Sequence, residues 1–183
     1  MTIVLIVILL ALLAWVMFAF NRLVRLRNQM KTAWADIDVQ LTRRHDLVPP
    51  LVAAVKGYAT HEAAVLEAVT ELRTQAMHAS GPARLGQIES ALEQALARLF
   101  VLKEAYPELE ASENFSQLQR DLVEIEEHLQ YARRFYNGAV RDYNDTVQRV
   151  PDLIVARSFG FTAGEFYQVD DEVRLPVRVE LRR

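Results

Sequence analysis

Histidines and carboxylates at defined spacings are the residues that could hold a metal or move protons, and the chain has four histidines: His45, His61, His78 and His128. His61-Glu62 is not followed by the second histidine of the H-E-x-x-H zinc motif. A di-iron bundle repeats Glu-x-x-His, whereas Glu124 and His128 form one pair that is spaced by four. No G-x-S-x-G elbow or phosphate-binding glycine loop occurs. The sequence therefore predicts solvated helix faces, with no enzymatic activity, metal or cofactor.

A second group consists of polar residues on or beside apolar helix faces: Arg44, Glu62, Asn137 and Asn144. The sequence Arg134-x-Tyr136-Asn137 recurs seven residues later as Arg141-x-Tyr143-Asn144, so both copies face the same way. These residues form either a groove for a partner or ligand, or a buried network that fixes the register of packed helices. We favour the network because buried polar residues usually specify packing.

Heptad-spaced apolar residues predict the helices that position these side chains. The first seam runs from Met30 to Ala76 and is interrupted by Pro49-Pro50, where we favour a kink over a hairpin. Ser80-Gly81-Pro82 separates this helix from a second one, which Pro107 ends. We expect Asn114 to cap a third helix.

The third predicted helix extends to about Arg149, because Pro151 follows, and residues 152–158 add a short helical turn. Beyond it the pattern changes to alternation over residues 173–181, which is typical of a β-strand. The alternating apolar residues are Val173, Leu175, Val177, Val179 and Leu181. We expect this tail to oligomerise the protein, by pairing with the same tail of other subunits or with a partner's sheet edge.

The N-terminus carries nineteen residues without a charge, Thr2–Phe20, which as a helix would be about 28 Å long and would span a bilayer. The basic residues Arg22, Arg25 and Arg27 follow the run, which argues against a cleaved signal peptide. They should contact anionic headgroups and keep the following chain in the cytoplasm. We therefore expect a single-pass protein of the cell (inner) membrane with a short N-terminus outside.

Composition limits the remaining possibilities. The net charge is −3 with no basic stripe, so no nucleic-acid partner is expected, and the absence of cysteine excludes disulfides and thiolate chemistry. The predicted fold is all-α: one transmembrane helix (1–21) continues into an elongated antiparallel helical bundle (22–159). A C-terminal tail (160–183) follows, with the strand at 173–181.

Four stretches of the chain resemble the LemA family of bacterial membrane proteins. They are AWADIDVQLTRRHDLVPPLVAAVKGYATHE (33–62), AYPELEASENFSQLQ (105–119), ARRFYNGAVRDYN (132–144) and GFTAGEFYQVDDEVRLPV (160–177). Pro50 departs from the family's pattern, in which a polar residue is usual. The resemblance implies a membrane helix with a short external N-terminus, a cytoplasmic antiparallel bundle and no enzymatic activity.

Together these features predict a membrane-anchored, non-enzymatic scaffold that self-assembles and organises membrane or partner proteins. The alternative is an adaptor or regulator of a membrane enzyme such as a protease. The expected partners are the lipid bilayer, further copies of the chain and another membrane protein.

Overall fold

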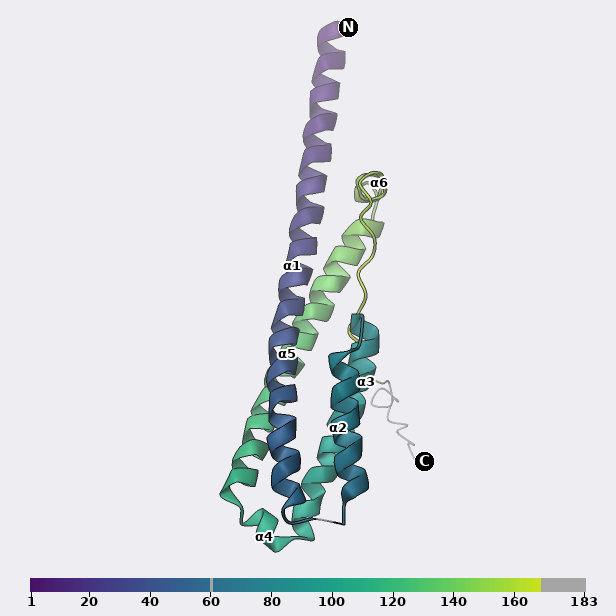
Figure 1. Cartoon of the computed structure of the whole chain (residues 1–183). Helices are drawn as coiled ribbons and strands as arrows, with labels where there is room; N and C mark the ends of the chain where they lie inside the picture. Colours follow the sequence, from purple (N-terminus) through teal and green to yellow (C-terminus); the bar gives the residue numbers. More distant parts are fainter. Residues whose placement is uncertain (60, 169–183) are drawn as a thin grey trace, which may run out of the picture. The chain divides into compact units, whose positions relative to one another are not determined.

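The computed structural model describes residues 1–59 and 61–168, and within them every regular element is a helix (Figure 1). The α-helices are α1 (Thr2–Lys56), α2 (Ala63–Met77), α3 (Pro82–Val101), α4 (Pro107–Glu110), α5 (Glu113–Gln148) and α6 (Asp152–Ser158), with a 3₁₀ turn η1 (Leu102–Glu104) after α3. The all-α class and the long apolar N-terminal helix are thereby confirmed. The strand predicted at 173–181 lies outside the described residues.

Helix α1 corrects the prediction of one seam from Met30 to Ala76. It continues through Pro49 and Pro50 and ends at Lys56, and the chain reverses before α2 begins (Figure 1). Both prolines are exposed, and each leaves the carbonyl four residues earlier without its intrahelical donor. The helix ends just before Gly57, a residue that is unfavourable in a helix interior. The turn therefore lies at the glycine, and a hairpin at the prolines is ruled out.

The predicted stop between α2 and α3 is confirmed. Gly81 has a φ of 85°, in the left-handed region that glycine adopts without strain, and Pro82 is the first residue of α3. The cap of α5 was predicted two residues too late, at Asn114 and not at Ser112. The Phe115 backbone N–H donates to Ser112 Oγ at 3.4 Å, and Asn114 lies within the helix. Serine caps helices as well as asparagine does, so composition alone did not separate the two.

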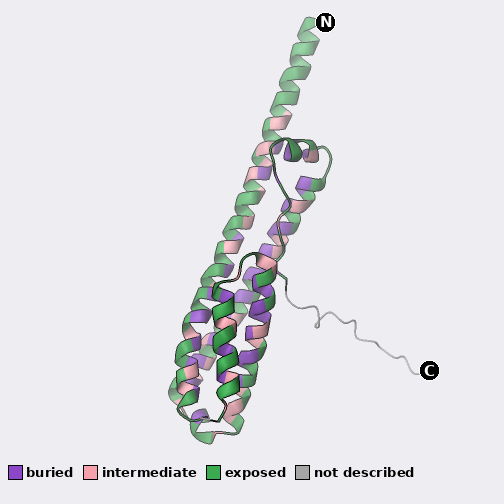
Figure 2. Ribbon diagram, turned by 45° about the vertical axis from the view of Figure 1, so that its right-hand side comes forward, coloured by how far each residue is buried: buried purple, intermediate pink, exposed green. Residues whose placement is uncertain are grey.

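The described residues fall into two compact units. The first comprises Met1–Asp46 and Arg120–Phe166, and the second comprises Leu47–Gln119 with Tyr167 and Gln168. Buried and exposed positions alternate around the helices of each unit, whereas the first turns of α1 are exposed all round (Figure 2). Within the second unit, α2 packs against α3. The predicted boundaries at residues 21/22 and 159/160 stay a prediction.

Candidate functional site

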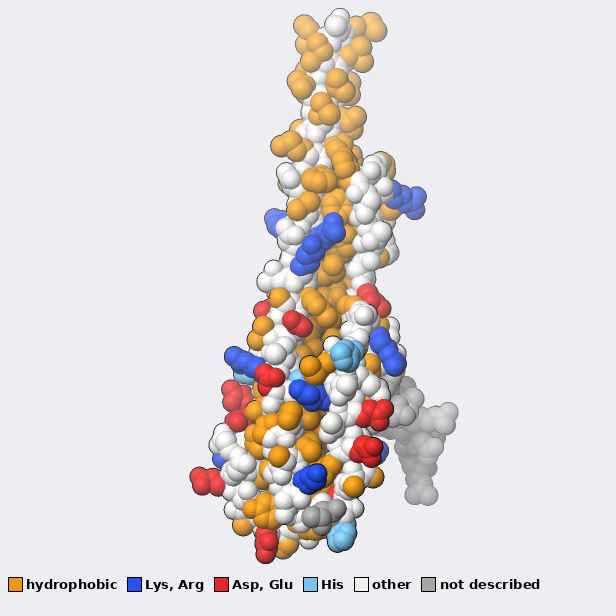
Figure 3. Space-filling model, viewed as in Figure 1, with side chains coloured by type: hydrophobic (Ala, Val, Ile, Leu, Met, Phe, Trp, Pro, Cys, Tyr) orange, Lys and Arg blue, Asp and Glu red, His pale blue; other side chains and the backbone are white. Residues whose placement is uncertain are grey.

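Among the described helices, α1 is long and apolar enough to cross a membrane. Its most apolar window has a mean hydropathy of 3.2, and only 6% of that window is buried within the protein. Figure 3 shows the apolar side chains covering this end of the helix without an intervening charge. A core helix of similar composition would be covered by the protein. The exposed run is therefore a candidate bilayer-spanning segment by length and composition.

The three arginines after this run have different surroundings. Arg22 is half-buried, and its Nη1 lies 3.4 Å from Asp152 Oδ2 of α6. Arg149 Nη2 lies 3.7 Å from the same carboxylate oxygen. Arg25 and Arg27 are exposed. The charge of Arg22 is thus partly balanced inside the protein, whereas Arg25 and Arg27 face its surroundings.

Arg44, one of the predicted polar residues, is buried on α1 in the first unit. Its Nη1 lies 3.1 Å from Glu126 Oε2 of α5, and Arg133 Nη1 donates to Glu126 Oε1 at 3.3 Å. Two buried guanidinium groups therefore share one carboxylate. Glu126 and Arg133 were not predicted as members of the polar network, although their spacing along the sequence could have identified them. They precede the buried residues Val140 and Val147 at intervals of seven, so they belong to the same helix face.

Asn144 and Tyr136 hold the segment that follows α6. Asn144 Nδ2 donates to the Gly164 carbonyl at 2.9 Å, and the Gly164 N–H donates to Asn144 Oδ1 at 2.7 Å. The Tyr136 hydroxyl donates to the Glu165 carbonyl at 2.8 Å. Asn137 lies half-buried on α5 beside Tyr136. Asn144, one of the two asparagines of the repeated motif, thus makes two hydrogen bonds to the backbone of the loop that follows α6.

Burial and charge keep these tyrosines protonated. Burial, followed by the charge of Glu165, raises the pKa of Tyr136 to about 12. Burial also raises the pKa of the Tyr143 hydroxyl, against an opposing effect of Arg27. A phenol with a raised pKa is a hydrogen-bond donor at neutral pH and a poor general base. Tyr136, whose hydroxyl donates to the Glu165 carbonyl, is therefore suited to positioning the loop.

Glu62, the fourth predicted polar residue, lies in the second unit. It directly precedes α2 and accepts a hydrogen bond from the Tyr106 hydroxyl at 3.4 Å. Arg44, Asn137 and Asn144 belong to the first unit. A single network that joins all four residues stays a prediction.

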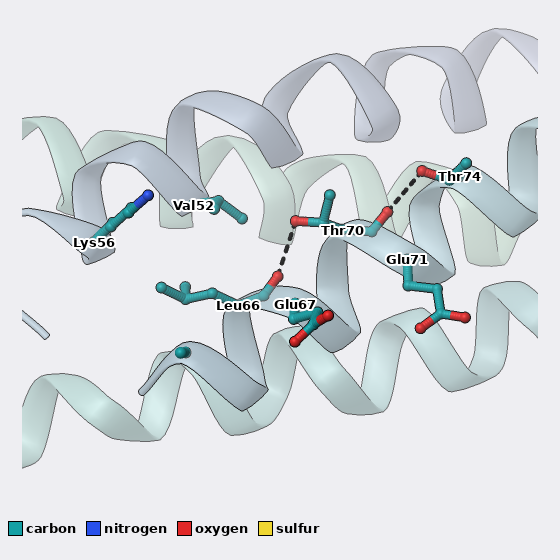
Figure 4. Close-up of a pocket in the computed structure, with 8 residues that line it drawn as sticks. Val52, Lys56, Leu66, Glu67, Thr70, Glu71 and Thr74 are labelled. Carbon is teal, nitrogen blue, oxygen red and sulfur yellow. Dashed lines mark hydrogen bonds between the residues drawn. The ribbon is translucent and has the colours of Figure 1, made fainter. Parts of the chain in front are cut away.

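An open groove of about 630 Å³ lies in the second unit between the end of α1 and α2 (Figure 4). It is lined by Val52, Lys56, Ala63, Leu66, Glu67, Thr70, Glu71 and Thr74. The hydroxyls could act as nucleophiles only if a base took their protons. Instead, Thr70 donates to the Leu66 carbonyl and Thr74 to the Thr70 carbonyl, each at 2.9 Å. The groove can hold an apolar side chain, but its hydroxyls are engaged by their own helix.

Within residues 1–59 and 61–168, no group of three histidines or carboxylates is arranged to bind a metal ion. His128 Nε2 lies 3.8 Å from Glu124 Oε1, and both side chains are exposed. The predicted oligomerisation residues Val173, Leu175, Val177, Val179 and Leu181 lie outside the described part of the chain.

Comparison with known proteins confirms the predicted resemblance. The LemA family model matches residues 33–181. Magnetosome proteins MamQ 1 and MamQ 2 of Paramagnetospirillum magneticum are each 24% identical over 187 residues, covering 86% of this chain and 68% of the relative. Magnetosome protein MamQ of Magnetospirillum gryphiswaldense is 21% identical over 188 residues, covering 87% and 68%.

Proposed function

The chain belongs to the LemA family, and from this premise we propose that it is a membrane-anchored, non-enzymatic scaffold that assembles with copies of itself. The observation that carries the proposal is the continuity of α1. The exposed apolar run passes without interruption into positions such as Leu23 and Ile37, which are buried in the first unit. No flexible linker separates the anchor from that unit. The bilayer therefore sets the position of the first unit.

The anchor also defines the proposed location. The protein crosses the cell (inner) membrane once, with a short N-terminus outside and an antiparallel helical bundle in the cytoplasm. Arg25 and Arg27 are exposed directly after the apolar run and can reach lipid phosphates, in keeping with the positive-inside rule. A reporter fused after Arg183 tests the orientation. A cytoplasmic reporter should be active there, and a fully active periplasmic alkaline phosphatase fusion would overturn it.

Self-assembly is the second part of the proposal, with the tail residues Val173–Leu181 as the pairing element. The names of the family and of its MamQ relatives specify no reaction, in keeping with a structural role. The test is the mass of detergent-purified full-length protein, measured by light scattering and electron microscopy. A large homogeneous assembly of this chain alone is expected. A monomer that co-purifies with a membrane enzyme such as a protease would instead favour an adaptor.

A further inference from the structure

Helix α6 packs on the last turns of the apolar run of α1. Ala19 and Leu23 are buried against residues from α5, from α6 and from the chain after it: Tyr143, Val147, Val155, Ala156 and Phe161. Trp15, Val16 and Phe20 pack against the same cluster. The Phe20 ring meets those of Phe159 and Phe161 edge to face, with centroids 5.0 Å and 5.6 Å away. The end of the candidate span and α6 therefore form one packed body within the first unit.

This packing determines the depth of α6 once α1 spans a bilayer. Residues 1–14 are all exposed, but the thirteen helical residues among them extend only about 20 Å, too short for a hydrocarbon core of about 30 Å. The turns from Trp15 to Phe20 must therefore also lie in or at the edge of the hydrocarbon. Side chains in van der Waals contact share nearly the same depth. Phe159, Phe161 and Val155 consequently lie at the membrane interface.

The outer surface of α6 has the composition of an interfacial element. Val150, Ile154 and Phe159 are 70%, 61% and 56% exposed, although they are large and apolar. Arg149 and Arg157 beside them are exposed. The carboxylate of α6, Asp152, is buried and paired with Arg22 and Arg149, so it opposes no lipid phosphate. Apolar residues with flanking arginines bind the boundary between acyl chains and anionic headgroups.

We propose that α6 and its flanking residues Val150 and Phe159 are a second lipid-contacting element. Ile154 and Phe159 insert into the leaflet in which α1 ends, and the exposed Arg157 binds its anionic phosphates. The inference rests on the proposed membrane anchor. It gives the first unit two points of contact with one leaflet, which limits the tilt and rotation of α1.

The absence of cysteine allows a direct test with single-cysteine variants of the full-length protein. Ile154→Cys and Phe159→Cys carry the environment-sensitive dye NBD, in vesicles of phosphatidylethanolamine and phosphatidylglycerol. Met17→Cys, on the exposed apolar run, is the control for the anchor. Val39→Cys and Tyr131→Cys are exposed positions of the same unit away from α6. Circular dichroism verifies that each variant keeps its helix content.

The proposal predicts blue-shifted emission at positions 154 and 159, quenching by shallow nitroxide lipids, and protection from aqueous iodide. Positions 39 and 131 should be quenched by iodide. If position 17 is in lipid but 154 and 159 are open to iodide, the inference fails while the anchor stands. If 154 and 159 are protected from iodide and also from nitroxide lipids, protein covers them, and the inference is again overturned. If position 17 itself is in water, the anchor is refuted.

Discussion

At the scale of single residues, Glu126 stands between two buried guanidinium groups. Arg44 and Arg133 are each 4% exposed, whereas Glu126 keeps a quarter of its side chain in contact with solvent. Replacing one arginine leaves the carboxylate with the other arginine and with water. Replacing the carboxylate withdraws the shared counter-charge from both arginines at once. Breaking a buried ion pair by removing one partner costs about 3–5 kcal/mol.

We therefore expect Glu126→Leu to lower the free energy of unfolding by about that amount and Arg44→Leu to lower it by less. Urea unfolding of the full chain in detergent, followed by circular dichroism, measures both. Glu124→Leu is the matched control, because Glu124 is exposed on the same helix and should change stability by less than about 0.5 kcal/mol. Unchanged stability in both Arg44→Leu and Arg44→Glu would show that Arg44 contributes nothing to stability through this cluster.

Tyr136 makes a prediction about alkaline pH. Its folded pKa of about 12 lies above the ordinary value of 10.0, so between these values the folded protein keeps a proton that the unfolded chain has lost. The stabilisation is complete below pH 10 and is lost as the pH rises to 12. Buried Tyr143 acts in the same direction.

Tyr136→Phe should make this alkaline loss of stability smaller. At neutral pH it should cost about 0.5–1.5 kcal/mol, because the hydrogen bond to the Glu165 carbonyl is removed. Unfolding free energies are compared across this pH range for the unmodified protein, for Tyr136→Phe and for Tyr131→Phe, which changes an exposed tyrosine. Identical pH profiles in all three proteins would contradict the assignment.

At the scale of elements, glycines have different roles in α3 and α5. Gly86 is buried in α3, and a Cβ there would overlap the carbonyl group of Gln168. Gly138 lies within α5, and a Cβ there would meet no atom within 4 Å. Gly86 permits a close approach between the backbone of α3 and that of Gln168. Gly138 has no such contact and only adds the conformational cost of a glycine in a helix.

Gly86→Ala should therefore destabilise the second unit, since a backbone carbonyl must move to admit the methyl group. Gly138→Ala should instead stabilise the protein by up to about 1 kcal/mol, the usual preference for alanine over glycine in a helix. Thermal unfolding of the two variants in one detergent measures the difference. If both variants are stabilised alike, the chain at Gln168 does not rest on α3.

At the scale of the whole molecule, the predicted assembly element can be removed without touching a described helix. Deleting residues 173–183 should reduce a large assembly to smaller species and leave the helix content nearly unchanged. Light scattering and circular dichroism in detergent measure the two quantities. Arg174→Gln with Arg178→Gln is the control, because it changes the intervening positions and keeps the alternating apolar residues. An unchanged mass after the deletion would exclude the tail as the oligomerisation element.

Periodicity and helix-stop residues were sufficient to predict most of the helices. The apolar run of α1, the stop at Gly81-Pro82, the end of α5 near Pro151 and the short α6 all depend on local chemistry. Each of these features depends on residues that are close together in the sequence. They are the length of the apolar run, the charges that follow it, the backbone conformation of glycine and the missing N–H of proline. These features, and the family resemblance, were therefore accessible from the sequence.

Only the tertiary structure shows which polar residues contact one another. It also shows that α1 ends at Lys56, although the apolar pattern of the sequence continues beyond that residue. The sequence identified Arg44 and Asn144 as unusual, but their contacts with Glu126 and Gly164 join residues 82 and 20 positions apart. It likewise placed a short helix at 152–158 without indicating that Phe159 packs against Phe20 of the apolar run. Such contacts depend on the three-dimensional path of the chain, because a helix face shows that a residue is buried but not what covers it.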